Sequence, residues 1–274
     1  MVIMQLAWET NNVFTVEIAE TTTLMELHML TLKRSTDRKT ANLSTPNGKQ
    51  AKIKNAFGLP AGKEFSCPGM TSVCGKICYA GKLEKLFPGF RNVMEHNWNQ
   101  VKDASYDELV EGIDSIIKDF IADCDKWDAE KLFRIHHDGD MFNVLYAKAW
   151  ATVIKNNPDV KFWLYTRSYT KELNIVPFFA GLDNVSLYLS VDTDNANEAM
   201  KVKKDNPWVK LAGLGETFDK AAALVKVISG RNSVARCPEL NGALPLITTD
   251  GGACSVCNLC VEGRGDVVFS TTKK

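Results

Sequence analysis

The sequence predicts an α/β protein, a partial or complete (βα) barrel of about six parallel strands. From residue 132 onward, short apolar runs alternate with helical patterns of roughly 8 to 15 residues, the order expected of right-handed βαβ crossovers. Each of these apolar runs ends in charged residues or glycine, as parallel strands do where they meet a ligand. One more strand is expected just before a cysteine-rich loop, which would therefore follow the first strand of the barrel.

The first 40 residues are expected to form a small β extension. Weak alternation of apolar and polar residues at 13–18 and 27–32 indicates two strands. Residues 35–49 are rich in Ser, Thr, Asn, Asp and Lys and end in Pro46-Asn47-Gly48, so we expect a loop there. A short strand at 51–55 then leads into the first cysteines, within a barrel-like domain that spans residues 41–236.

Two long helices are expected between the first cysteines and residue 132. The first, at 83–102, is interrupted at Pro88-Gly89, and the second, at 106–127, places its apolar residues along one stripe. Beyond them the sequence predicts strands at 132–136, 160–165, 185–191, 208–212 and 233–236, which alternate with helices at 145–155, 170–179, 195–203 and 218–229.

The ends of these five strands are rich in polar residues. The polar clusters occupy 136–140, 166–168, 190–194, 213–216 and 236–237. Any one of them fits a strand that simply leaves the sheet for a solvated loop. Five at the same edge of a parallel sheet favour a ligand-binding mouth instead.

The cysteines fall into two groups that frame this barrel. Seven of the eight belong to them: Cys67, Cys74 and Cys78, spaced C-x6-C-x3-C, and Cys237, Cys254, Cys257 and Cys260, of which the last three are spaced C-x2-C-x2-C. Cysteines that serve as small apolar fillers would be scattered, as Cys124 is in the helix at 106–127. Because no export signal is expected, the compartment is reducing, and grouped thiols there hold metal more often than they form disulfides. Residues 237–274 are therefore expected to form a metal-binding segment packed on the barrel.

A 4Fe-4S cluster is the metal group that the spacing favours. The C-terminal triplet, with a more distant cysteine that precedes Pro238, has the elements of a bacterial ferredoxin run. Zinc is the alternative, although its sites more often use two separate C-x2-C pairs. The first group has three cysteines, which leaves either one open iron or a fourth ligand such as His96, His136 or a cysteine of the second group.

Composition excludes some classes of partner. The chain has 33 basic and 33 acidic residues, so its net charge of zero makes a nucleic-acid partner improbable. No run of 18 apolar residues is present, and the N-terminus lacks the pattern of a signal peptide. We therefore expect no membrane segment and a cytoplasmic location.

Five segments together resemble the phage gene product 88 family over residues 41–262. They are the stretches CGKICYAGK, HHDGDMFN, FWLYTRS and LSVDTDN, and the closing pair CPE and CSVCNLC. More distantly, the chain is similar to the radical S-adenosylmethionine (SAM) superfamily, whose usual loop is C-x3-C-x2-C. The first resemblance implies a phage protein in the host cytoplasm.

The distant resemblance implies a site. Cys67, Cys74 and Cys78 would hold a 4Fe-4S cluster with one free iron, and the C-terminal cysteines an auxiliary cluster. Gly139 and Asp140 would lie where the methionyl amine of SAM is held, and Ser168 and Asp192 near its ribose or carboxylate.

Three functions stay open at this point. The first is an iron-sulfur enzyme of radical SAM type acting on a small-molecule substrate. The second is a non-catalytic iron-sulfur protein with a closed cluster, which senses redox state or contacts a host protein. The third is a zinc-stabilised binding module.

Overall fold

The computed structural model describes residues 29–40, 42–44 and 50–271, and the predicted strand at 13–18 lies outside them. Its centre is a parallel sheet of seven strands in the order β3-β4-β5-β6-β7-β11-β8. These strands are β3 (Ala56–Gly58), β4 (Leu132–Asp138), β5 (Lys161–Thr166), β6 (Val185–Val191), β7 (Lys210–Gly215), β11 (Val267–Ser270) and β8 (Ala235–Arg236). Since β3 and β8 are opposite edges, the sheet of the described residues is open, and the complete barrel is not found in them.

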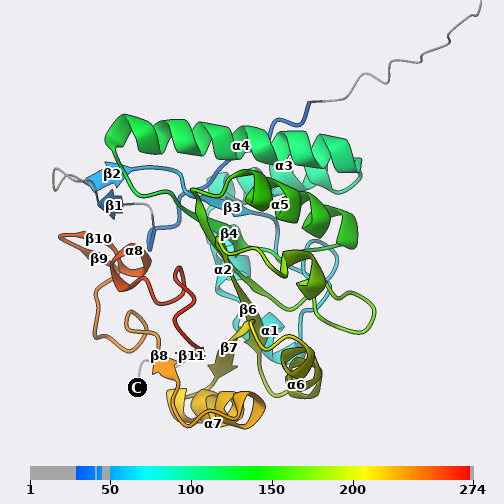
Figure 1. Cartoon of the computed structure of the whole chain (residues 1–274), viewed down its shortest axis with the longest axis vertical. Helices are drawn as coiled ribbons and strands as arrows, with labels where there is room; N and C mark the ends of the chain where they lie inside the picture. The colour runs from blue at the N-terminus through cyan, green and yellow to red at the C-terminus, as the bar shows by residue number, and fades with distance from the viewer. Residues whose placement is uncertain (1–28, 41, 45–49, 272–274) are drawn as a thin grey trace, which may run out of the picture.

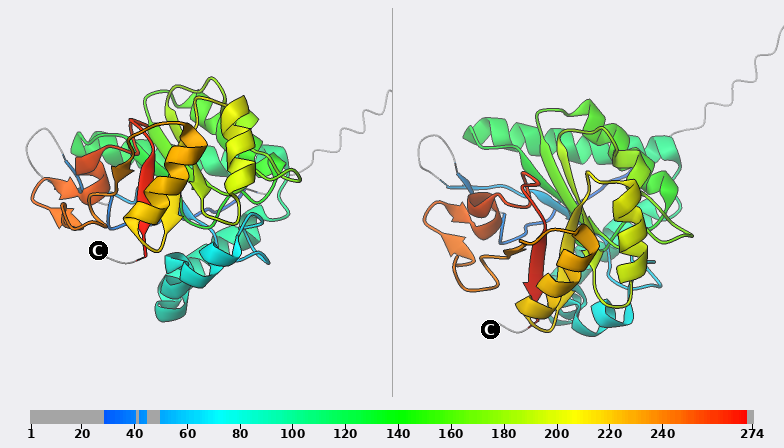
Figure 2. Two further views of the ribbon diagram at one scale, coloured as in Figure 1. Left: turned by 90° about the horizontal axis from the view of Figure 1, so that it is seen from below. Right: turned by 60° about the horizontal axis from the view of Figure 1, so that its bottom comes forward.

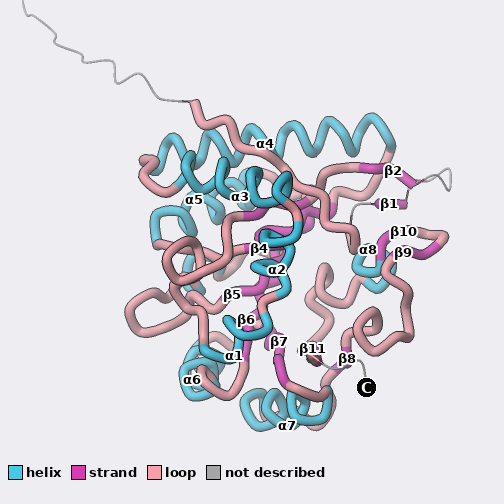
Figure 3. Tube along the Cα trace, turned by 180° about the vertical axis from the view of Figure 1, so that it is seen from behind, coloured by secondary structure: helices cyan, strands magenta, loops and turns pink. Residues whose placement is uncertain are grey.

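Helices cover the sheet on both sides. On the side of the viewer in Figure 1 lies α5 (Val144–Asn156), with α4 (Tyr106–Trp127) above it and α6 (Ala196–Asp205) and α7 (Phe218–Ser229) at the lower end. From behind, α2 (Tyr79–Leu86) crosses in front of the strands, next to α1 (Ser72–Ile77) and α3 (Pro88–Val101) (Figure 3). Helices α1, α2 and α3 therefore form their own layer, which the left view of Figure 2 shows below the sheet.

The predicted bounds of α4 are confirmed, and its sequence explains them. Ser105 caps the helix reciprocally with Glu108: its backbone N–H donates to Glu108 Oε2 at 2.8 Å. The helix ends at Asp128, which has a left-handed φ of 49°. Cys124 is fully buried in this helix, as expected of a packing residue, beside the apolar stripe Leu109, Ile113, Ile116, Ile117 and Phe120.

Most other predicted elements of the sheet are confirmed. Strand β6 and helix α7 have the predicted bounds, while β4, β5, β7, β8, α5 and α6 overlap theirs. The helix expected at 83–102 is indeed divided: α2 ends at Leu86, and Pro88 begins α3, where its missing N–H costs nothing.

Four expectations were wrong. Residues 29–32 form no strand. The loop expected at 35–49 contains β1 (Asn42–Ser44), and the strand expected at 51–55 is replaced by β2 (Gln50–Lys52), which pairs with β1, and by β3. Residues 170–179 form only a 3-10 turn, η1 (Val176–Phe179), because Ile175 N–H donates to the Ser168 carbonyl at 3.0 Å and closes a loop.

The C-terminal segment is part of the sheet, which the sequence did not predict. Strand β11 inserts between β7 and β8, and its flanking residues form β9 (Ile247–Thr248), β10 (Gly251–Gly252) and α8 (Ala253–Cys257). Among the described helices, none has the length and apolar character needed to cross a membrane.

Candidate metal centre

The first cysteine loop, residues 66–78, lies across the carboxyl ends of β4, β5 and β6. Thr71 Oγ1 donates to Asp192 Oδ2 at 2.6 Å, and Ser72 Oγ donates to Asp194 Oδ2 at 2.5 Å. Gly69 packs so closely on β5 that an added Cβ would lie 2.2 Å from the Arg167 carbonyl oxygen. The polar strand ends, which were predicted to line a ligand-binding mouth, therefore position the loop.

Asp140 connects the cysteine loop to the ends of the strands. Its carboxylate accepts hydrogen bonds from Thr166 Oγ1 at 2.6 Å and from the backbone N–H groups of Met141 and Arg167, each at 2.7 Å. Burial raises the pKa of Asp140 to about 6, and these hydrogen bonds oppose the rise. Its own N–H donates to Ser66 Oγ at 3.3 Å, which connects it to the loop.

The other residues predicted to bind a cofactor lie in the same place. Ser168 Oγ is buried and donates to the Met141 carbonyl at 2.6 Å. Asp192 forms an ion pair with Arg167 at 2.7 Å, and both side chains are almost fully buried. The structure thus brings Gly139, Asp140, Ser168 and Asp192 together, with the polar side chains of the last three bonded to strand ends and loop.

Gly139 offers a direct test of this packing. Its φ is +81°, and an added Cβ would lie 2.4 Å from Ser66 Oγ and 2.8 Å from the Leu59 carbonyl oxygen. We expect Gly139→Ala to lower the free energy of unfolding by about 2 to 4 kcal/mol in urea titrations. Gly181→Ala is the matched control, because its φ is +77° and no atom lies within 4 Å of its added Cβ. Equal losses in the two variants would contradict the close packing at Gly139.

The thiols of the first group are partly buried. Burial raises the pKa of the Cys67 thiol, and the charge of Asp140 raises it further. Burial also raises the pKa of Cys74, which the charge of Arg167 opposes and that of Cys78 increases. Cys78 Sγ accepts a hydrogen bond from Gly81 N–H at 3.4 Å, at the first turn of α2.

The four cysteines of the second group lie in one part of the fold. Cys237 and Cys260 pack on the same small apolar cluster, and Cys254 and Cys257 belong to α8, just before Cys260. Burial raises the pKa of Cys260 to about 11; a hydrogen bond from Tyr165 opposes the rise, and the charges of Cys237 and Cys257 add to it. Burial raises the pKa of Cys254 to about 12, and Cys260 adds to that shift too. The segment is fixed at both ends, since Cys254 N–H donates to the Lys39 carbonyl at 2.9 Å and Cys237 N–H to the Val268 carbonyl at 3.0 Å.

This donor set fits a soft metal group by residue type. All eight cysteines are described and have free thiols. Without a metal, ionising several neighbouring, half-buried thiols costs free energy. A bound metal cation offsets this cost, because it stabilises the thiolates. Within residues 29–40, 42–44 and 50–271, no three His, Cys, Asp or Glu side chains already stand in a metal-binding arrangement, so the thiols would have to turn. The groups remain separate, since α1 and α8 lie apart in Figures 1 and 3.

The two histidines considered as a fourth ligand have other partners. His96 Nε2 lies 2.6 Å from the Thr31 carbonyl. His136 Nε2 lies 2.9 Å from the Tyr146 hydroxyl, and its ring is buried and stacks on that tyrosine. Both positions are thus explained by packing and hydrogen bonding.

Because His136 is buried, we expect the folded protein to lose stability in acid. Burial, with a smaller effect of His137, lowers its folded-state pKa to about 3, whereas an unfolded histidine has a pKa of about 6.5. As the pH falls below about 6.5 the unfolded state takes up the proton first, so the free energy of unfolding falls by up to about 1.4 kcal/mol per pH unit. We expect His136→Asn, which suits the φ of 57°, to have a flatter profile in urea titrations at pH 7, 6 and 5. Equal slopes in variant and wild type would contradict this assignment.

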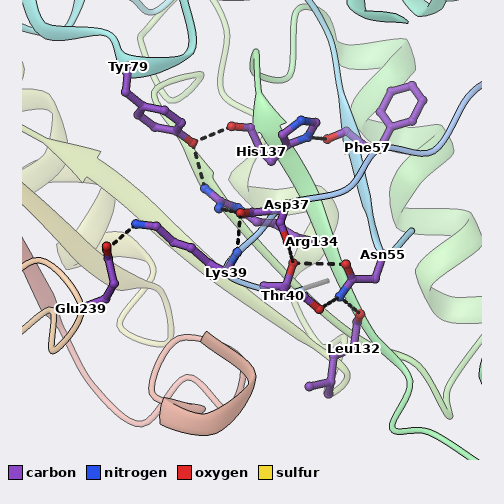
Figure 4. A network of polar contacts seen from close by, with 10 residues as sticks. All are labelled: Asp37, Lys39, Thr40, Asn55, Phe57, Tyr79, Leu132, Arg134, His137 and Glu239. Atoms are coloured by element: carbon purple, nitrogen blue, oxygen red, sulfur yellow. Dashed lines mark hydrogen bonds and ion pairs between the residues drawn. The ribbon is translucent and has the colours of Figure 1, made fainter. Parts of the chain in front are cut away.

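Sequence reasoning missed a buried polar network between the two cysteine groups (Figure 4). At its centre is Arg134 of β4, whose guanidinium contacts the Asp37 carboxylate and donates to the Tyr79 hydroxyl at 3.2 Å. Lys39, close by, pairs with Glu239 at 2.6 Å. A charged residue inside the apolar run at 132–136 was the one signal of this network in the sequence.

Comparison with known proteins identifies the family. The family described as Gene product 88 matches residues 30–263. The chain is 43% identical over 249 residues to the Gene 88 protein of Mycobacterium phage L5, which covers 90% of this chain and 100% of that protein. It is also 43% identical over 250 residues to the Gene 88 protein of Mycobacterium phage D29, with the same coverage. No solved structure matches. The chain therefore belongs to the phage gene product 88 family.

Proposed function

We propose that this protein is an iron-sulfur protein that binds 4Fe-4S clusters at its two cysteine groups. The observation that carries the proposal is the placement of Cys237 and Cys260 on one apolar cluster beside β8 and β11, with Cys254 and Cys257 on α8 just before Cys260. Four thiolates are the usual ligands of such a cluster, and the Tyr165 hydroxyl is placed to donate to one of the sulfurs.

The first group supports a second, finer proposal of radical SAM type. Three thiols lie at the carboxyl edge of a parallel sheet, which would leave one iron of a bound cluster without a protein ligand. SAM would occupy that position, and Gly139, Asp140, Ser168 and Asp192 surround the loop at that edge. When bound, the cluster would supply the electron that cleaves SAM, and the residues of the chain would orient and enclose the ligand.

The hydrogen bonds of these residues support the non-catalytic alternative as well as they support the enzyme. The side chains of Asp140, Ser168 and Asp192 already bond to the chain itself, so they support the loop without any ligand. In that case the first cluster is completed by another ligand, and the protein acts in the host cytoplasm by redox sensing or contact with a host protein. Four thiolates from the second group would also suit zinc, the third alternative.

An anaerobic titration with SAM separates these proposals. The enzyme predicts that SAM changes the electron paramagnetic resonance (EPR) spectrum of the reduced cluster, and that the change is lost in Cys74→Ser. A spectrum indifferent to SAM would favour a closed cluster acting through a partner. The Cys124→Ala variant is the matched control, because Cys124 is buried in α4 away from both groups.

A further inference from the structure

Arg134 is a buried cation between the two cysteine groups. It belongs to β4, its side chain is 12% exposed, and its guanidinium lies 5.5 Å from the centre of the Tyr165 ring. Its guanidinium also contacts the Asp37 carboxylate and the Tyr79 hydroxyl (Figure 4). Arg134 therefore touches side chains from three separate parts of the chain.

Those contacts connect it to both groups. Tyr79 directly follows Cys78, and its hydroxyl also donates to the His137 carbonyl at 2.5 Å. On the other side, Asp37 Oδ1 accepts from Lys39 N–H at 3.0 Å, and the Lys39 carbonyl accepts from Cys254 N–H. Tyr165, under the guanidinium, packs on the same apolar cluster as Cys260.

Packing alone does not account for an arginine here. Burying a guanidinium costs several kcal/mol unless its donors are fully paired, and Arg134 Nε has no hydrogen-bond partner in the described part of the chain. An apolar residue would suit the interior of a strand better. The position is explained if the charge itself acts on a neighbouring anionic group.

The charge of Arg134 lies close to the second group. The Tyr165 ring under the guanidinium packs on the same small apolar cluster as Cys237 and Cys260. On the other side, the Lys39 carbonyl, two residues past Asp37, accepts from Cys254 N–H at 2.9 Å. Tyr165 and the segment 37–39 therefore connect the guanidinium with the second group.

We propose that Arg134 is a positioning residue for the metal group held by the second cysteine group, and that its guanidinium sets the reduction potential of that group. This inference rests on the proposed iron-sulfur function. Reduction of a 4Fe-4S cluster adds one electron and one unit of negative charge without making or breaking a covalent bond. A nearby fixed cation stabilises the reduced form and so raises the potential.

The test uses the full chain with Cys67, Cys74 and Cys78 all replaced by alanine, so that the second group is the only cluster site. Dithionite titration followed by EPR gives its reduction potential. We expect Arg134→Gln to disfavour reduction at least tenfold, a shift of 59 mV for one electron, and Arg134→Lys to keep the potential. Asp37→Asn, which removes the opposing charge, should shift the potential in the opposite direction. Arg91→Gln, an exposed cation on α3, is the control and should change nothing.

The opposite signs distinguish electrostatic tuning from loss of structure. Unchanged potentials in Arg134→Gln and Asp37→Asn, or shifts of the same sign, would overturn the inference while leaving the iron-sulfur proposal intact. If Arg134→Gln does not fold, Lys39→Met replaces it and should also lower the potential, because it removes a second cation from the residue whose carbonyl binds Cys254 N–H. A triple-alanine background that holds no iron would overturn the inference and the assignment of a cluster to the second group.

Discussion

Replacing Cys260 with serine is expected to remove one whole cluster, about four irons per chain, from the anaerobically purified protein. The reason is that Cys260 packs on the same apolar cluster as Cys237 and lies three residues past Cys257, which places it in the second ligand set. Iron and sulfide analysis measures the effect. Cys124→Ala should keep the wild-type content, because Cys124 lies in the apolar stripe of α4. Equal iron in Cys260→Ser and wild type would exclude Cys260 as a ligand.

Replacing Arg167 with methionine is expected to lower the free energy of unfolding of the metal-free, reduced protein by about 3 to 5 kcal/mol. Arg167 and Asp192 have side chains that are 8% and 1% exposed, so the substitution leaves an unpaired carboxylate in the interior. Asp192 also accepts from Thr71, so the first cysteine loop should loosen at the same time. Urea titration measures the stability, and limited proteolysis measures the loop.

Two controls make the Arg167 prediction specific. Arg91→Met breaks a pair with Glu95 that is about half exposed, and it should cost less than about 1 kcal/mol. The double variant Arg167→Met with Asp192→Leu should be more stable than Arg167→Met alone, because no buried charge is left unpaired. A double variant that loses as much as the single one would show that packing and not charge is responsible.

The sequence was most informative where local patterns determine structure. The apolar stripe at 106–127 predicted α4, and apolar runs alternating with helices predicted β4 to β7. Strand β11 was not predictable in this way, because it has four residues and pairs in parallel with the distant β7. The helix expected at 170–179 failed because Ser168 pairs with Ile175, and Tyr169 with Asn174, and these pairs close a loop there.

The candidate site was only partly visible in the sequence. Cysteine spacing singled out both groups, and the polar strand ends singled out Asp140 and Asp192. Their contacts with the loop were not predictable, because Thr71 and Asp192 are 121 residues apart in the chain. Arg134 was missed for the same reason: its partners, Asp37 and Tyr79, lie in segments that only the fold brings together.

Metal content tests the central claim most directly. The protein should be purified without oxygen and analysed for iron, zinc and acid-labile sulfide together with its visible spectrum. We expect roughly four or eight irons per chain, matched by sulfide, with the broad absorption of 4Fe-4S clusters. Zinc bound in place of iron, without sulfide, would contradict the iron-sulfur account and support a zinc-stabilised module.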